Sequence, residues 1–292
     1  MRARLLLGAA LGGLLAIGGL SGAFEGLAAT APPCATAQPA VARDLALSVD
    51  GVERDVRLHA PRAAAGRRQA LLVALPGAWG HGRLLESATG LSRLADREGF
   101  AVAYVDPLHG RWAAHTDAPR GKDDVAFIGA AIDTVSHARC IGRGHVWLAG
   151  VSNGAGEAAR AACELADRVS AVVLVAGVYR SLPPCHAAHP VSVFEIHGTA
   201  DRVAPYRSGG GVPAFLSAWR TRDACLLPGA HVRIDPETVQ ATWRCAANTR
   251  VAQLRLQGAA HGWPVARAGG RPVAEVAVEF LSALAVRSMS GG

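Results

Sequence analysis

The sequence predicts an α/β fold in which a mostly parallel central sheet is covered by helices on both faces. Apolar, strand-like runs alternate with helical runs along most of the chain, as in sheets built from strand–helix–strand units. Half of the 292 residues are hydrophobic, which is ample for the core of one such domain. No repeat or low-complexity linker divides the body, and Asp50-Gly51 between the first two strands is a hairpin signal. The expected strands lie near 45–49, 53–60, 70–75, 100–104, 145–149, 171–176, 191–196 and 251–256, and the expected helices near 87–98, 123–139, 155–167, 211–222 and 274–287.

The first 29 residues predict an export signal. Two arginines precede a long run of apolar or small residues, and cleavage is expected after Ala28 or Ala29. An uncleaved anchor is the alternative, because the run is just long enough to span a bilayer, but its many glycines and alanines favour the signal peptide. We therefore expect a secreted protein without stable membrane association once the signal is cleaved. A mobile lead-in is expected over 30–44, and a single α/β domain over 45–292.

A Gly-x-Ser-x-Gly pattern centred on Ser152 is the most informative stretch of the chain. A strand-like run over 145–149 precedes it and a helix-forming run follows from Ala155. Strand, tight turn and helix form the context in which this motif is a nucleophile elbow, with the serine hydroxyl held at the sheet edge above a helix N-terminus that favours negative charge. An ordinary glycine-rich turn is the alternative, since the chain has 34 glycines.

Two downstream residues complete the order serine, acid, histidine that such an elbow requires. Asp201 follows a buried strand-like run that ends near His197, and His261 lies on a glycine-flanked loop after the alternating run over 251–256. An acid and a histidine at the carboxyl ends of parallel strands would lie at the same sheet edge as the serine. Asp201 as a plain turn residue is the alternative, and Glu195, inside the strand, is the alternative acid.

The loop after the strand over 70–75 is expected to supply an oxyanion hole. This loop runs from Pro76 to Gly82 and is rich in glycine. Backbone N–H groups of Ala78 and of Asn153, the residue after the serine, would face the developing negative charge of an acyl-transfer intermediate. A plain turn at the end of the strand is the alternative.

With these residues in place, the chain resembles the secreted α/β-hydrolase esterases grouped with poly(3-hydroxybutyrate) depolymerases, feruloyl esterases and acetyl-xylan esterases. The resemblance spans about residues 45 to 285. It implies an α/β-hydrolase fold, Ser152 as nucleophile, Asp201 as acid and His261 as base, with no metal and no organic cofactor. The matching stretches are Ala95-Asp-Arg-Glu-Gly-Phe-Ala-Val-Ala-Tyr104, Asp123-Asp-Val-Ala-Phe-Ile128, Gly150-Val-Ser-Asn-Gly154, Ala162-Cys-Glu-Leu-Ala-Asp-Arg168, Ile196-His-Gly-Thr-Ala-Asp201 and His261-Gly-Trp-Pro264.

Two positions depart from the family's pattern. The usual His-Gly at the oxyanion strand is Pro76-Gly77 here, and the usual Gly-Gly before the histidine is Ala259-Ala260. Pro76 has no N–H to donate, but the expected donor comes later in the loop. Neither departure removes a catalytic group.

Six cysteines in an exported chain predict disulfides. No two of them form a Cys-x-x-Cys pattern, so a zinc site is disfavoured. The resemblance implies that Cys225 pairs with Cys245, which would stiffen the segment leading to His261. The sequence leaves open how the other four pair: Cys34, Cys140, Cys163 and Cys185.

The charge pattern argues against a nucleic-acid partner. The formal net charge is +7, almost all of the positive charge is arginine, and Lys122 is the only lysine. These charges are scattered instead of forming a run that could track a phosphate backbone. A solvated basic surface is the plain interpretation, and mild attraction to acidic polysaccharide is the alternative.

Three tryptophans are candidate substrate contacts. Trp79 and Trp263 flank expected catalytic positions, and Trp112 lies on a loop after another strand. Aromatic walls could stack on a feruloyl ring or a sugar, or face a polyester chain, and core packing is the alternative.

The expected substrates are feruloyl or acetyl esters of plant polysaccharide. Short-chain polyhydroxyalkanoate, such as polyhydroxybutyrate, is the alternative ester. A non-catalytic binding protein on the same fold is an alternative of another class, disfavoured because serine, acid and histidine are all present. The oligomeric state stays open.

Overall fold

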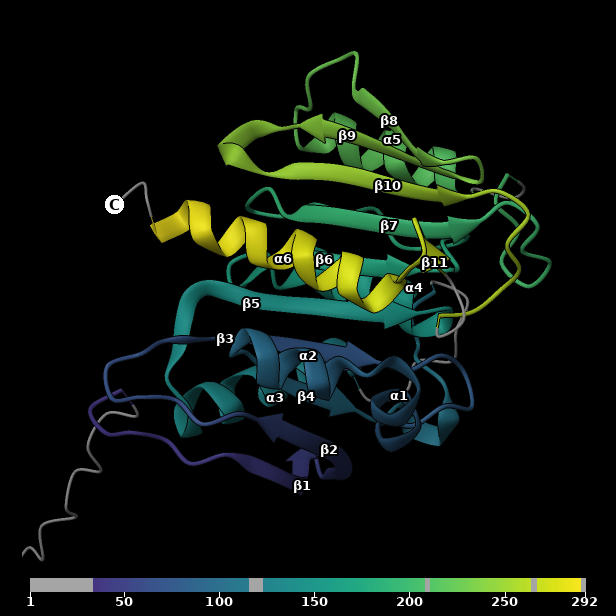
Figure 1. Ribbon diagram of the computed structural model, residues 1–292. Helices are drawn as coiled ribbons and strands as arrows, with labels where there is room; N and C mark the ends of the chain where they lie inside the picture. Colours follow the sequence, from purple (N-terminus) through teal and green to yellow (C-terminus); the bar gives the residue numbers. More distant parts are fainter. Residues whose placement is uncertain (1–33, 116–122, 208–210, 264–266, 290–292) are drawn as a thin grey trace, which may run out of the picture. The chain divides into compact units, whose positions relative to one another are not determined.

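The computed structural model describes residues 34–115, 123–207, 211–263 and 267–289 (Figure 1). The expected signal peptide, residues 1–29, lies outside the described residues, as does Lys122. All of the described elements belong to the unit Pro32–Gly292.

A mostly parallel sheet runs through this unit. In the described part of the chain it has ten strands, in the order β1-β2-β4-β3-β5-β6-β7-β10-β9-β8. The central strands from β4 to β10 are parallel, while β1, β2, β8 and β9 add antiparallel edges. The bounds are β1 (Val41–Val49), β2 (Val52–Ala60), β3 (Gln69–Leu75), β4 (Ala101–Val105), β5 (Ile141–Val151), β6 (Val169–Val175), β7 (Ser192–Gly198), β8 (Ala230–Asp235), β9 (Thr238–Arg244) and β10 (Arg250–Leu256), with a separate ribbon of β11 (Arg267–Ala268) and β12 (Arg271–Pro272).

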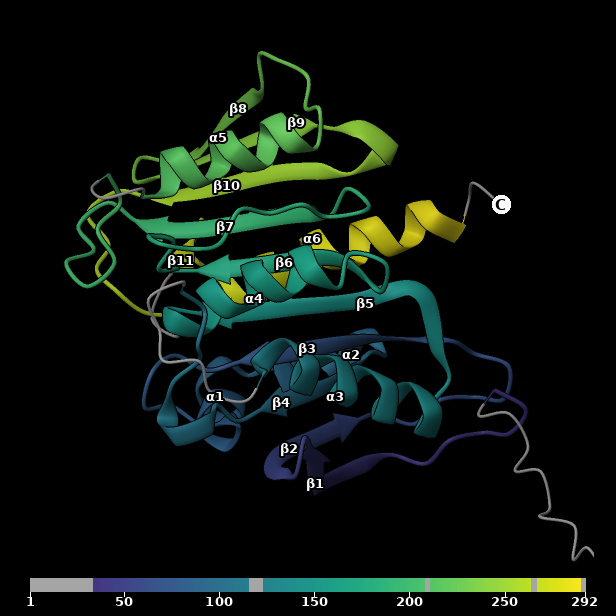
Figure 2. The same ribbon diagram turned by 180° about the vertical axis from the view of Figure 1, so that it is seen from behind.

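Helices cover both faces of the sheet, as predicted. One apolar core lies under α1, α2 and α6, which are on the side toward the viewer in Figure 1. The other lies under α3, α4 and α5, seen from behind in Figure 2. The bounds are α1 (Gly82–Thr89), α2 (Leu91–Glu98), α3 (Asp124–Ala138), α4 (Asn153–Glu164), α5 (Val212–Arg222) and α6 (Val273–Met289), with short 3-10 turns η1 (Leu108–Gly110) and η2 (Ala246–Asn248).

Two features of the secondary structure correct the sequence prediction. The helix expected over 87–98 is two helices, because Gly90 adopts a left-handed conformation (φ 67°) that ends α1 and begins α2. Strands β8 and β9 were not predicted. The side chains of β8 are exposed along most of its length, so it lacks the apolar alternation by which a half-buried strand is found.

The described part of the expected lead-in, residues 34–44, is held against the domain. Cys34 is disulfide-bonded to Cys140. Gln38 exchanges two backbone hydrogen bonds with Ala63, at 2.8 and 3.0 Å, and β1 starts at Val41. Folded structure therefore begins before the boundary expected at residue 45, because a covalent link and strand pairing fix this segment.

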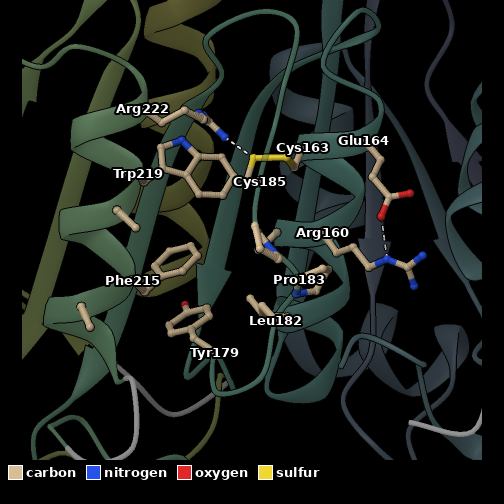
Figure 3. Close-up of a pocket in the computed structure, with 14 residues that line it drawn as sticks. Arg160, Cys163, Glu164, Tyr179, Leu182, Pro183, Cys185, Phe215, Trp219 and Arg222 are labelled. Carbon is tan, nitrogen blue, oxygen red and sulfur yellow. Dashed lines mark hydrogen bonds and ion pairs between the residues drawn. A yellow bond between two sulfur atoms is a disulfide. The ribbon is translucent and has the colours of Figure 1, made fainter. Parts of the chain in front are cut away.

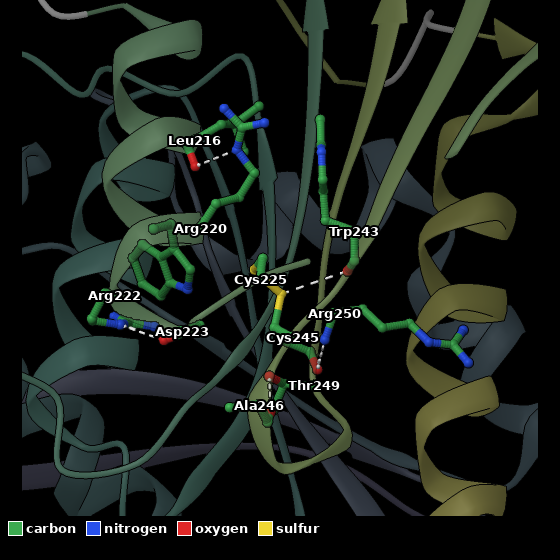
Figure 4. Close-up of a disulfide and its surroundings, with 12 residues drawn as sticks. Leu216, Arg220, Arg222, Asp223, Cys225, Trp243, Cys245, Ala246, Thr249 and Arg250 are labelled. Atoms are coloured by element: carbon green, nitrogen blue, oxygen red, sulfur yellow. Dashed lines mark hydrogen bonds and ion pairs between the residues drawn. A yellow bond between two sulfur atoms is a disulfide. The ribbon is translucent and has the colours of Figure 1, made fainter. Parts of the chain in front are cut away.

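Three disulfides join segments that are distant in sequence. Cys225 is bonded to Cys245, the pair that the resemblance implied, and the remaining bonds are Cys34–Cys140 and Cys163–Cys185. Figure 4 shows Cys225–Cys245 between the segment after α5 and the end of β9. Because β9 pairs with β10, this bond braces the strand that leads to His261. Three disulfides fit an oxidising compartment.

Among the described helices, none combines the length and the apolar character needed to cross a membrane.

We predict that the Cys34–Cys140 bond contributes more stability than Cys163–Cys185. It closes a loop of 106 residues against 22, and a longer loop restricts the unfolded chain more. Replacing both Cys34 and Cys140 by serine should lower the free energy of unfolding by about 2–5 kcal/mol, measured by urea denaturation without reductant. The matched Cys163→Ser/Cys185→Ser variant should lose less. A larger loss from the shorter loop would contradict this ranking.

Glu157 is an unusual core residue on α4. Its side chain is fully buried, and neither carboxyl oxygen has a hydrogen-bond partner in the described structure. Burial, together with the nearby charge of Asp124, raises the pKa of Glu157 to about 8. The side chain is therefore mostly a neutral acid at pH 7.

The Glu157 carboxyl should make stability fall with rising pH. The folded chain keeps a proton at Glu157 between the ordinary pKa of 4.5 and the raised value of about 8, whereas the unfolded chain has lost it. Across this window the free energy of unfolding falls by roughly 1.4 kcal/mol per pH unit because of this group. Glu157→Gln should therefore stabilise the protein more at pH 8 than at pH 5, in urea titrations at both values. Glu164→Gln, which changes a more exposed glutamate on the same helix, is the control. If Glu157→Gln stabilised the protein equally at both pH values, the raised pKa of Glu157 would be refuted.

Candidate active site

Ser152 lies in a strained turn between β5 and α4. Its backbone has φ 56° and ψ −120°, a conformation that residues other than glycine rarely adopt. The surrounding backbone holds it there. Its N–H donates to Val175 O at 2.9 Å, and its carbonyl accepts from the N–H groups of Ala155 and Gly156 at 3.1 and 3.2 Å. The backbone at Ser152 therefore makes the tight strand-to-helix turn that the motif predicts.

The two motif glycines are required by close backbone contacts. A Cβ at Gly150 would lie 2.2 Å from the carbonyl oxygen of Gly154, and a Cβ at Gly154 would lie 2.2 Å from that of Pro76. Neither contact can relax by moving a flexible side chain, since the clashing atoms are backbone. The turn and the loop after β3 thus pack directly against each other.

Asp201 and His261 meet at the ends of β7 and β10. The Nδ1 atom of His261 lies 2.7 Å from Oδ2 of Asp201. The other oxygen, Oδ1, accepts the backbone N–H groups of Val203 and Ala204 at 2.9 and 2.8 Å, so the buried carboxylate is held in one orientation. An imidazole that donates Nδ1–H to this carboxylate leaves Nε2 free to accept a proton.

The two loops that carry this pair are locked together by their backbones. Strands β7 and β10 run parallel, and Gly198 is in register with Leu256. Beyond them, Thr199 N–H donates to Leu256 O at 2.9 Å, and Ala200 N–H donates to Ala259 O at 3.1 Å. A Cβ at Gly198 would lie 2.2 Å from Ala259 O, so glycine is needed for this approach.

Ser152 and His261 line one cavity of about 270 Å³. Its walls come from the loop after β3, from α1, from the end of β5 and from the loop after β10. Sequence reasoning missed the contribution of α1, because the predicted helix started five residues too late. The lining residues are Pro76, Gly77, Ala78, Gly80, His81, Leu84, Leu85, Ala88, Thr89, Val151, Ser152, His261, Gly262 and Trp263.

The backbone N–H groups of the two expected oxyanion donors have no backbone acceptor among the described residues. In the described part of the chain, no backbone acceptor takes the N–H of Ala78 or of Asn153, whereas the N–H of Trp79 donates to Gly110 O at 2.6 Å. Ala78 lines the cavity. Asn153 is the first residue of α4, and its side chain exchanges two hydrogen bonds with the backbone of Trp112, at 2.8 and 3.2 Å.

The structure places one of the three candidate tryptophans in the wall of this cavity. Trp263 lines the cavity, although only 3% of it is exposed. Trp79 is 74% exposed and is not among the cavity-lining residues; its ring lies under the guanidinium of Arg111. Trp112 is a buried packing residue whose Nε1–H donates to Pro76 O at 2.8 Å. The expected substrate contact of Trp112 is therefore corrected: it braces the loop after β3.

A second histidine, the buried His197, lies behind Asp201. Its Nε2 is 3.3 Å from Asp201 Oδ2, and its Nδ1 is 2.8 Å from Glu195 Oε1. Glu195, the alternative acid, thus pairs with His197, while Asp201 pairs with His261. Sequence reasoning assigned His197 no role, since a buried histidine at the end of a strand has no distinguishing local pattern.

A separate cavity of about 350 Å³ lies between α4 and α5 (Figure 3). Figure 3 shows Tyr179, Phe215 and Trp219 on one side and Arg160 on the other. Tyr179 and Phe215 are stacked, with ring centroids 4.0 Å apart. None of its lining residues lines the Ser152 cavity, so it is not part of the candidate site.

Within the described residues, no three His, Cys, Asp or Glu side chains are grouped so that they could hold a metal ion.

Comparisons with known proteins point to esterases. Residues 55–216 match the family model described as esterase PHB depolymerase. The putative esterase NocK of Nocardia uniformis subsp. tsuyamanensis is 30% identical over 279 residues, with 80% of both chains covered. The bifunctional acetylxylan esterase/xylanase XynS20E of Neocallimastix patriciarum is 29% identical over 217 residues, which cover 72% of this chain and 31% of that protein.

Among solved structures, the acetyl xylan esterase from Aspergillus awamori matches with a TM-score of 0.64 and 13% sequence identity. The match covers 82% of this chain and 99% of that one. At this identity the likeness shows the fold alone, and it bears out the α/β-hydrolase fold.

We predict that Gly154→Ala disrupts the turn at Ser152. The added methyl group would meet the Pro76 carbonyl at 2.2 Å, so the loop after β3 must move. Thermal unfolding followed by circular dichroism should show a loss of about 2 kcal/mol or more. Gly129→Ala on α3 is the matched control, because its nearest neighbour would be 3.6 Å away. That change should be neutral or slightly stabilising; equal losses from both variants would contradict the prediction.

Proposed function

The chain belongs to the esterase PHB depolymerase family and is a carboxylic ester hydrolase, and from this premise we propose that it works by acyl transfer through Ser152, His261 and Asp201. The observation that carries the proposal is the 2.7 Å contact between His261 Nδ1 and Asp201 Oδ2 beside the cavity that Ser152 and His261 share. A serine-dependent acyl-transfer site needs a serine on a strained turn, a histidine and a buried carboxylate, and these three residues supply them.

The first half of the reaction forms an acyl-enzyme. His261 Nε2 takes the proton from the Ser152 hydroxyl while its oxygen attacks the ester carbonyl carbon. The carbonyl oxygen becomes an oxyanion, which the backbone N–H groups of Ala78 and Asn153 stabilise. The C–O bond to the alcohol then breaks, and His261 returns the proton to the leaving alcohol.

The second half releases the acid. Water attacks the acyl carbon while His261 removes its proton, and Ser152 leaves as the hydroxyl after receiving that proton. Asp201 holds the Nδ1–H tautomer of His261 and stabilises the imidazolium in both halves. The N-terminus of α4, directly after Ser152, adds favourable potential for the oxyanion.

Acetyl or feruloyl esters of plant polysaccharide are the substrates we propose. The relative from Neocallimastix patriciarum, a bifunctional acetylxylan esterase/xylanase, supports the acetyl case. A cavity of about 270 Å³ is small for a binding site and suits a short acyl group, with Leu85 and Trp263 in its walls. Trp79 on the exposed surface remains a candidate contact for the sugar side.

A short-chain polyhydroxyalkanoate is the second candidate substrate, because the description of the matching family names a polyhydroxybutyrate (PHB) depolymerase. Its short 3-hydroxyacyl unit also suits a small cavity. Membership in an esterase family argues against the non-catalytic alternative.

We also propose that residues 1–29 are a cleaved signal and that the protein is exported, as its three disulfides support. No metal or organic cofactor and no nucleic-acid partner enters the proposal.

We predict that Ser152→Ala abolishes ester hydrolysis and that Asp201→Asn lowers turnover about 10⁴-fold, because the imidazole is then held in the wrong tautomer. The assay compares p-nitrophenyl acetate, methyl ferulate, acetylated xylan and amorphous polyhydroxybutyrate with purified protein. Serine-dependent release of acetate from xylan would support the lead substrate. Preference for the polyester would promote the second candidate.

The control for this series is Ser170→Ala, a serine at the start of β6, whose activity should match the parent. A fluorophosphonate probe should label the parent and the control but not Ser152→Ala. Turnover that persists in Ser152→Ala would refute the nucleophile assignment.

A further inference from the structure

A row of buried polar side chains extends the His261–Asp201 pair into the domain. Glu195 and His197 lie two residues apart on β7, so both point to the same face of the sheet. Glu195 is fully buried and His197 is 1% exposed. The row runs from Glu195 through His197 to Asp201 and then to His261 at the cavity.

The acceptors around His197 fix where its protons lie. Nε2 faces the Ala204 carbonyl oxygen at 2.8 Å and Asp201 Oδ2 at 3.3 Å. A carbonyl oxygen only accepts, so Nε2 must carry a hydrogen and must be the donor. The Nε2–H therefore points at the turn that holds Asp201.

Three groups converge on the carboxyl of Glu195. His197 Nδ1 and the Tyr179 hydroxyl reach Oε1 at 2.8 and 3.3 Å, and Gln253 Nε2 reaches Oε2 at 3.5 Å. Burial raises the pKa of the Glu195 carboxyl, although the hydrogen bonds from these three groups oppose the rise. We take the pair as ionised, because a carboxylate accepts from all three and His197 is then an imidazolium with both nitrogens protonated. Burial lowers the pKa of His197, but the hydrogen bond and charge of Glu195 outweigh it and raise the pKa overall.

We infer that Glu195 and His197 are positioning residues for the reaction, which hold Asp201 toward His261 and offset part of its negative charge. The inference rests on the proposed function, because it assigns His261 as the base. A variant that removes the His197 charge would leave the Asp201 charge less offset and would favour protonated His261, so the pH dependence of activity reports this role.

Other ionisable groups face this row from the neighbouring elements. Arg255 on β10 is in register with His197. The ring of Tyr206 meets that of His197 edge-on at 5.9 Å, and Arg207 lies over the Tyr206 ring. His81 shares the cavity with His261. None of these is altered in the variants below, so their effects on pH dependence cancel in the comparison.

The test measures kcat and KM for p-nitrophenyl acetate between pH 5 and 9 in the full mature chain. Glu195→Gln should leave His197 neutral, so the acid limb of kcat/KM should move upward by about 0.5–1 pH unit. His197→Leu also loses the donor to Asp201 and should lower kcat about tenfold at little change in KM. Tyr179→Phe, which keeps the ring stacked on Phe215, should shift the limb in the same direction by less.

Glu157→Gln is the matched control, because it removes another fully buried glutamate carboxyl outside this row. Its pH profile should superimpose on that of the parent. Melting temperatures and the far-ultraviolet circular dichroism of each variant report whether it folds, and Tyr179→Phe is the mildest change.

The outcomes separate this inference from the proposed function. If Ser152→Ala is inactive but the profiles of Glu195→Gln and Tyr179→Phe match the parent, the triad stands and the positioning role is overturned. Lower kcat without any movement of the acid limb would show a purely structural role and would also overturn it. If Ser152→Ala keeps full turnover, the proposed function fails, and the inference fails with it.

Discussion

The backbone turn at Ser152 is the constraint on which the rest of the site depends. A non-glycine residue at φ 56° is strained, and it persists only because its neighbours leave no alternative. Gly154 packs so closely on Pro76 that a single methyl group would not fit between them. This contact ties the first turn of α4 to the loop after β3, and so it decides where the N–H of Ala78 lies relative to the serine.

The parallel sheet supplies the remaining geometry. Because β5, β7 and β10 run in the same direction, the loops that carry Ser152, Asp201 and His261 emerge at one edge. Backbone hydrogen bonds between the loops after β7 and β10 then set the distance between Asp201 and His261. The antiparallel β9 and the disulfide after it brace β10 from the outer side.

Buried charge is organised around Asp201. Its carboxylate receives two backbone N–H groups and lies between two histidines, one facing the cavity and one facing the core. An arrangement of this kind keeps a negative charge inside the protein at low cost, because every oxygen has a donor. Glu157, with no such partners, shows the contrasting solution, in which the acid stays protonated.

What the sequence by itself determined is the local chemistry and its order: the glycine pattern around Ser152, the acid after β7, the histidine after β10 and the alternation that builds a parallel sheet. These follow from contacts between near neighbours in the chain. Only the tertiary structure decided that Trp112 packs inside, that Gly90 divides one predicted helix into two, that an exposed β8 pairs with β9, and that His197 backs Asp201. The burial of Trp112 and the place of His197 depend on which distant segments meet, and the residues carry no local signal of those contacts. Gly90 and the β8–β9 hairpin are local features that the hydrophobic pattern did not distinguish, because β8 lacks apolar alternation.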